Sequence, residues 1–114
     1  MKNSNNAKTI ASVQNHMARQ VGGKKALFEE MQQAKKRNGS LGMGIYELVD
    51  GGIFLIYNGD VYNFLHRLGY TKAQLDKMDS SKRWDLYRHL LIRDGERFYR
   101  DYERAKAVKK TAKR

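Results

Sequence analysis

Residues 44–67 read GIYELVDGGIFLIYNGDVYNFLHR, and the rest of the chain is organised around this stretch. Residues 43–49 alternate between two faces, as a half-buried strand does. Asp50-Gly51-Gly52 follows, a turn that uses the left-handed conformations open to glycine. Residues 53–57 are continuously apolar and β-prone, which is typical of a strand covered on both faces. The pattern therefore predicts a β-hairpin.

Helical patterns lie on the N-terminal side of this predicted hairpin. Apolar residues three and four positions apart predict one helix over residues 7–21 and a second over residues 24–37. Gly22-Gly23 separates the two, and Asn38-Gly39 ends the second. Because neither apolar stripe is wide, two alternatives stay open: the helices dock on the core, or they fold only when a partner is present.

Three more helices are predicted after the hairpin. The first runs over residues 61–68 with Asp60 as its N-cap, and the second begins with the capping box Thr71-Lys72-Ala73-Gln74 and ends near residue 78. The last and longest runs over residues 82–108. The predicted fold class is thus α+β, a central β-hairpin packed by short helices and one long C-terminal helix, preceded by two N-terminal helices.

The same patterns predict how the chain is organised. We expect a disordered N-terminus over residues 1–6, a basic helical arm over 7–40, a core over 41–108 and a basic tail over 109–114. The chain of 114 residues suits one domain. It has no cysteine, which excludes disulfides and thiolate metal sites. No apolar run approaches the roughly 20 residues of a membrane span, so we expect a cytoplasmic protein without membrane contact.

The net charge is +11, and it is unevenly distributed. Residues 1–40 carry eight basic against two acidic residues, residues 41–79 three against five, and residues 80–114 twelve against five. Cationic ends favour binding to DNA or RNA through counterion release. The alternative is a solubilising surface, or ends that meet an acidic protein or a membrane.

The last predicted helix carries a stripe of arginines opposite its aromatic side chains. At 100° per residue, Arg93, Arg97, Arg100 and Arg104 fall on one face, with acidic residues along both edges. Guanidinium groups in such a row suit a phosphate backbone. The alternative is an ordinary solvated face with charge pairs. The predicted nucleic-acid-binding residues are Arg93, Arg97, Arg100 and Arg104, with Lys35, Lys36, Arg37, Lys109 and Lys110 adding affinity.

The central stretch also resembles the GIY-YIG nuclease family. Gly44-Ile45-Tyr46 reproduces the first signature, Tyr57-Asn58-Gly59 is similar to the second, and Arg67 follows on a predicted helix. The resemblance implies that Tyr46 and Tyr57 help to activate the attacking water and that Arg67 stabilises the phosphate. It also implies one Mg²⁺ held by a glutamate on a later helix, for which Glu103 is the first candidate. The alternative interpretation makes the two tyrosines cross-strand packing partners and Arg67 a surface residue.

Three functions follow from these observations. The first is non-catalytic binding of DNA or RNA through backbone phosphates, without a cofactor. The second is a reduced GIY-YIG-type endonuclease that depends on Mg²⁺. The third is a small modulator, of the kind that phages encode, that docks on a larger protein or nucleoprotein machine. Residues 70–81 discriminate between them, because a third strand there favours the nuclease and a helix argues against it.

Overall fold

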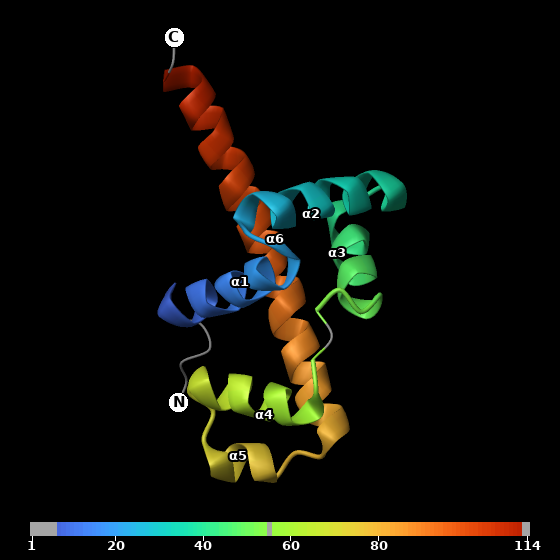
Figure 1. The fold of residues 1–114 in the computed structure, drawn as a ribbon, viewed down its shortest axis with the longest axis vertical. Helices are drawn as coiled ribbons and strands as arrows, with labels where there is room; N and C mark the ends of the chain where they lie inside the picture. Colours follow the sequence, from blue (N-terminus) through green and yellow to red (C-terminus); the bar gives the residue numbers. More distant parts are fainter. Residues whose placement is uncertain (1–6, 55, 113–114) are drawn as a thin grey trace.

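The computed structural model describes residues 7–54 and 56–112, and these residues form six α-helices and no strand (Figure 1). The helices are α1 (Ala7–Val21), α2 (Lys24–Asn38), α3 (Leu41–Asp50), α4 (Asn58–Arg67), α5 (Lys72–Asp76) and α6 (Ser80–Ala112).

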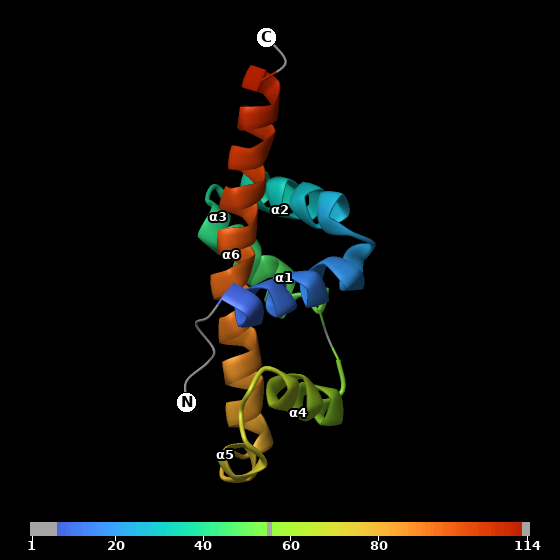
Figure 2. The same ribbon diagram turned by 90° about the vertical axis from the view of Figure 1, so that its left-hand side faces the viewer.

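The longest helix, α6, is the axis of the molecule. Its 33 residues correspond to about 50 Å of helix, and the molecule measures 53 × 28 × 22 Å. Helices α1 to α4 all pack against α6, and α5 packs against α4 (Figures 1 and 2). The C-terminal part of α6 extends beyond the other helices, and residues 103–108 are exposed. No helix in the described part of the chain is long and apolar enough to cross a membrane.

The predicted β-hairpin is wrong, and with it the predicted α+β class. The segment expected to form its first strand lies in α3, which begins where the Ser40 hydroxyl accepts a hydrogen bond from the Met43 N–H at 3.3 Å. The buried residues of α3 are Leu41, Gly44, Ile45 and Leu48, which lie on one face of a helix. This set fits only the helical period, because alternation would place Ile45 and Leu48 on opposite faces. Packing against α2 and α6 thus favours the helix.

The apolar run after α3 is also not a strand. Residues 51–54 form a turn, and residue 55 lies outside the described residues. Phe54 is buried, whereas Ile53 is 39% exposed and Tyr57 is 83% exposed. The run therefore connects α3 to α4 and is anchored in the core by Phe54.

Most of the predicted helices are confirmed. In the capping box, the Thr71 hydroxyl accepts from the Gln74 N–H at 3.1 Å, and the Gln74 side chain accepts from the Thr71 N–H at 2.8 Å. Asp79 accepts from the Lys82 N–H at the start of α6. Helix α4 begins earlier than predicted, with Tyr57 at the N-cap. Asp60 lies instead in its first turn, where a negative charge suits the helix dipole.

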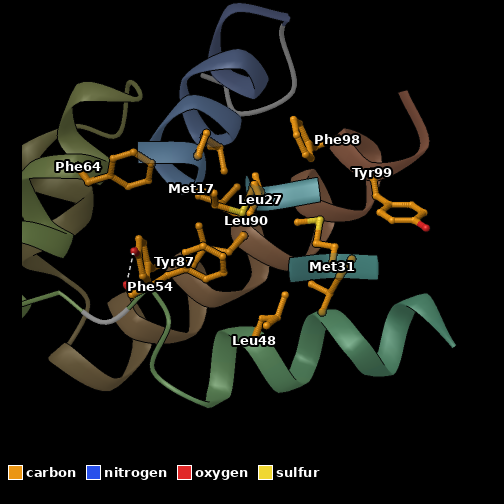
Figure 3. Close-up of a cluster of buried hydrophobic side chains, with 14 of the residues drawn as sticks. Met17, Leu27, Met31, Leu48, Phe54, Phe64, Tyr87, Leu90, Phe98 and Tyr99 are labelled. Carbon is orange, nitrogen blue, oxygen red and sulfur yellow. Dashed lines mark hydrogen bonds between the residues drawn. The ribbon is translucent and has the colours of Figure 1, made fainter. Parts of the chain in front are cut away.

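Helices α1 and α2 dock on the core, as the first of the two alternatives for residues 7–40 predicts. Val13 and Met17 of α1 and Leu27 and Met31 of α2 are at most 1% exposed. Figure 3 shows Met17, Leu27 and Met31 converging with Leu90 of α6. At about 1.5–3 kcal/mol for each large apolar side chain buried, these contacts stabilise the docked position of both helices.

A hydrogen-bonded tyrosine joins three separate parts of the chain. The hydroxyl of Tyr87, on α6, donates to the carbonyl oxygen of Phe54 at 2.9 Å (Figure 3). The Nε2 atom of His16, on α1, lies 2.8 Å from the same hydroxyl. Because the hydroxyl proton is used on Phe54, His16 must carry its proton on Nε2 and donate it to Tyr87. The three groups are buried, so each hydrogen bond satisfies a polar atom that has no water to replace it.

Substituting Gly44 tests the helical assignment of the central stretch. A Cβ at this position would lie 2.7 Å from the Lys35 backbone nitrogen and 2.8 Å from the Ala34 carbonyl carbon. Gly44→Ala should therefore force α3 away from α2 and destabilise the protein by at least about 2 kcal/mol, measured by urea unfolding.

Gly42→Ala is the matched control for this substitution. The same added methyl group meets nothing within 4 Å at Gly42, on the same helix. This variant should be as stable as the wild type or slightly more stable, because alanine is the better helix former. Equal effects of the two substitutions would contradict the close contact between α2 and α3.

A second prediction concerns stability at mildly acidic pH. Burial, followed by the charges of Arg19 and Arg67, lowers the pKa of His16 from 6.5 to about 4. Between these two values the unfolded chain binds a proton that the folded protein does not, so stability falls as the pH falls from 6.5 towards 4. The wild type should lose about 2 kcal/mol between pH 7 and pH 5, measured by urea unfolding.

The variants His16→Gln and His89→Gln separate this effect from other titrating groups. His16→Gln should lose most of the pH dependence in this range, because its side chain does not titrate. His89 is exposed, so His89→Gln should keep the wild-type dependence. If wild type and His16→Gln lose the same stability between pH 7 and pH 5, the buried neutral histidine is refuted.

Candidate nucleic-acid interface

The four predicted stripe arginines lie together on the outer face of α6. Together with Glu96 and Asp101, they line one shallow, open groove between side chains of this single helix. The buried side chains of α6, among them Tyr87, Leu91 and Phe98, lie on the opposite side of the helix. The groove is therefore a surface that the fold leaves uncovered.

Arg93 is the most firmly held of the four arginines. Its guanidinium forms two hydrogen bonds with the carboxylate of Asp94, at 2.9 Å and 3.0 Å. The Asp94 side chain has no exposed surface, whereas that of Arg93 is partly exposed. A buried carboxylate needs such a partner, because an unpaired buried charge is strongly unfavourable. Arg93 thus lines the groove and also neutralises the buried carboxylate of Asp94.

Two further arginines form ion pairs along the helix. Arg100 lies 2.7 Å from Glu96 one turn earlier, and Arg104 lies 3.1 Å from Asp101. The hydrogen bond to Glu96 raises the pKa of Arg100 above its usual value, so Arg100 stays charged. These four side chains are exposed, and exposed pairs contribute only about 0–1 kcal/mol. An incoming anion can therefore displace either carboxylate at small cost.

Arg97 lies between these pairs without one of its own. It is exposed, and no ion pair to it is found among residues 7–54 and 56–108. The groove thus has one unengaged guanidinium at its centre and ion-paired neighbours on both sides.

The basic residues at the end of α2 do not join this groove. Arg37 pairs with Glu47 of α3, and its hydrogen bonds hold the pKa of that carboxyl below its usual value. The Nζ atom of Lys35 lies 5.4 Å from the ring centroid of Tyr99, and Tyr99 lies about 200° around the helix from Arg97. Lys36 is exposed. Arg37 therefore links α2 to α3 through an ion pair. Lys35 lies on a different side of α6 from the arginine groove.

Two predicted contacts lie at the far end of α6. Lys109 and Lys110 continue the helix backbone, but their side chains lie outside the described residues. Lys106 was not singled out by the sequence patterns. It is exposed, and its Nζ atom lies 4.9 Å from the ring centroid of Phe28. The basic end of α6 therefore begins closer to the core than the predicted tail.

The residues of the nuclease resemblance are not presented on a hairpin, because the described residues form none. Tyr46 lies on α3 beside Arg88, with 5.2 Å between the guanidinium carbon and the ring centroid. Tyr57 precedes α4 and points into solvent, and Arg67 is the last residue of α4. Residues 70–81 contain α5 and the start of α6 rather than a third strand. The implied active-site architecture is therefore not formed.

The candidate metal ligand Glu103 is exposed on α6. Within the described part of the chain, no group of three or more His, Asp or Glu side chains is placed to hold a metal ion.

A second cationic site was missed by the sequence patterns. It is a cleft of about 220 Å³ between α1 and α4, lined by Ser12, Asn15, Arg19, Phe64, Arg67 and Leu68. Three of these residues recur at helical spacing on α1, which marks a polar face. Nothing local in the sequence indicates that this face meets Arg67, some 50 residues later, because the contact depends on the tertiary fold.

Comparison with known proteins assigns no relative to the chain. No protein-family model, no curated protein and no solved structure matches it.

Proposed function

We propose that this protein binds nucleic acid through the phosphate backbone, without catalysing a reaction on it. The observation that carries the proposal is the open groove on α6, where four arginines lie side by side opposite the core. A cytoplasmic location is part of the same proposal. Because phosphates are common to DNA and RNA, the proposal covers both.

The dimensions of the groove suit a polyphosphate ligand. From Arg93 to Arg104 the helix rises about 16 Å, which matches about five nucleotides of one strand at 3.4 Å each. Arginine presents a planar fork of N–H donors that binds phosphate oxygens in pairs. Mounting these groups on a continuous helix keeps their spacing fixed, so less entropy is lost when the ligand binds.

In the free protein, two acidic residues of the groove occupy the arginine groups that the ligand would bind. Glu96 and Asp101 hold Arg100 and Arg104 in place on the free protein. A phosphate polymer offers these arginines a denser negative charge and gains free energy by releasing its counterions. The net charge of +11 adds long-range attraction, which speeds association.

The nuclease alternative is not part of this proposal, because the hairpin on which it depends is absent from the described residues. Docking on an acidic protein surface would use the same cationic groups. Binding measurements with oligonucleotides distinguish this alternative from nucleic-acid binding.

The double variant Arg97→Gln/Arg100→Gln tests the proposal. If both arginines contact phosphates, the slope of log affinity against log salt should flatten by about 1.4 on single strands or about 1.8 on duplex DNA. Affinity at about 0.1 M salt should fall about tenfold or more. Fluorescence anisotropy with labelled oligonucleotides measures both quantities. The salt concentration should run from about 50 to about 300 mM, a range in which affinity through phosphate contacts depends strongly on salt.

Lys72→Gln/Lys77→Gln is the matched control, because it also removes two exposed positive charges but lies on and beside α5. It should change the slope far less than the groove variant does. Equal slopes in the two double variants, or binding that hardly depends on salt, would overturn the proposal. Absence of oligonucleotide binding together with a protein partner retained after nuclease treatment would favour the docking alternative.

A further inference from the structure

The cleft between α1 and α4 differs from the α6 groove in its charge. Two of its lining side chains are arginines, two are neutral polar groups, and none is acidic. The α6 groove, in contrast, contains Glu96 and Asp101 among its lining residues. The cleft is therefore the more strongly cationic of the two sites for its size.

The arginines of the described chain divide sharply by their partners. Five of them pair with carboxylates, and Arg83 donates to the carbonyl oxygens of Leu75 and Met78. Among the described residues, Arg19, Arg67 and Arg97 have neither kind of partner. Two of these three line the same cleft.

The cleft places its two arginines beside apolar side chains. Phe64 and Leu68 are buried and give it an apolar side, which lowers the local dielectric and strengthens charge interactions. The guanidinium carbon of Arg67 lies 5.9 Å from the Phe64 ring centroid, at the limit of a cation–π contact. Asn15 adds an exposed side-chain amide from α1.

The space suits a small anion. The cleft has a volume of about 220 Å³, well above the roughly 10–15 Å³ that a single water molecule needs, so it has room for an anion of several heavy atoms. The cationic character of the site extends inward, because Arg19 and Arg67 both contribute to lowering the pKa of buried His16.

We propose that the cleft between α1 and α4 is a phosphate-binding site, in which Arg19 and Arg67 donate to the phosphate oxygens from opposite walls and the Asn15 amide adds a further donor. Arginine is suited to this role because its planar fork matches two oxygens of one phosphate. The site is separate from the α6 groove and does not depend on the function proposed for that groove. The phosphate is either free or part of a nucleic-acid backbone, and the two sources share this chemistry.

The two arginines also lie in the last turns of their helices, where a cation suits the dipole. A purely structural role of that kind predicts no response to phosphate. Binding therefore separates the two explanations.

The test is an NMR titration of the ¹⁵N-labelled full chain with inorganic phosphate at constant ionic strength. We expect saturable shifts of the backbone amides of residues 12–19 and 64–68. A parallel titration uses a dinucleotide with one internal phosphodiester and no terminal phosphate. Saturation by inorganic phosphate identifies a site for free phosphate, whereas saturation by the dinucleotide alone identifies a backbone site, and both support the proposal.

Variants then assign the binding to the cleft. Arg19→Gln/Arg67→Gln should weaken binding at least tenfold while its amide spectrum stays that of a folded protein. Lys72→Gln/Lys77→Gln, which removes two exposed charges outside both sites, should bind the same probe as the wild type does. Shifts confined to residues 12–19 and 64–68 keep failure of the α6 proposal distinguishable from failure of this one. No saturable shift in the wild type would overturn the proposal even if the cleft variant does not fold. Equal binding by wild type and the cleft variant would overturn it as well.

Discussion

The buried hydroxyl of Tyr87 is the interaction on which the arrangement of the helices depends. It links α6 to the Phe54 carbonyl oxygen in the connection between α3 and α4, and to His16 on α1. No regular secondary structure satisfies that carbonyl oxygen, because it lies in a turn. Removing the hydroxyl would leave two buried polar groups without partners, which costs about 1–3 kcal/mol for each group.

This linkage also sets where the charged groups lie. With α1 and α4 both packed on the same part of the core, Arg19 and Arg67 come to share one cleft. With the aromatic face of α6 turned inward, the arginine stripe must face solvent. Both cationic sites are therefore consequences of how the core packs.

Two exposed ion pairs link the central helix α3 to its neighbours. Glu47 of α3 pairs with Arg37 of α2, and Asp50 of α3 pairs with Arg88 of α6 at 2.6 Å. These bonds hold the pKa values of both carboxyl groups below their usual values. The one segment without excess positive charge, residues 41–79, thus supplies acidic partners to α2 and α6.

Local signals were sufficient for the helices on both sides of this segment. Apolar spacing located α1 and α2, and the capping box located the start of α5. The arginine stripe was also predictable, because one continuous helix fixes the angle of every side chain.

The central stretch was not predictable from local patterns, because residues 43–49 can alternate between two faces until their burial is known. The deciding fact is the close packing of Gly44 against the backbone of α2, and that contact joins segments whose proximity no local pattern shows. Residues 53–57 were wrongly predicted to form a strand because they are continuously apolar. Of the described residues in this run, only Phe54 is fully buried. The cleft escaped prediction for the same reason as the packing of Gly44, since it joins two helices that lie far apart in the sequence.

The most direct test of the account is an NMR titration of the arginine side-chain Nε–H groups with a short oligonucleotide. If the α6 groove binds phosphates, the signals of Arg93, Arg97, Arg100 and Arg104 shift together and saturate together. Arg83 and Arg88 do not line the groove, so their signals should stay in place. Shifts confined to Arg83 and Arg88, or no saturable shift along the α6 groove, would contradict the account.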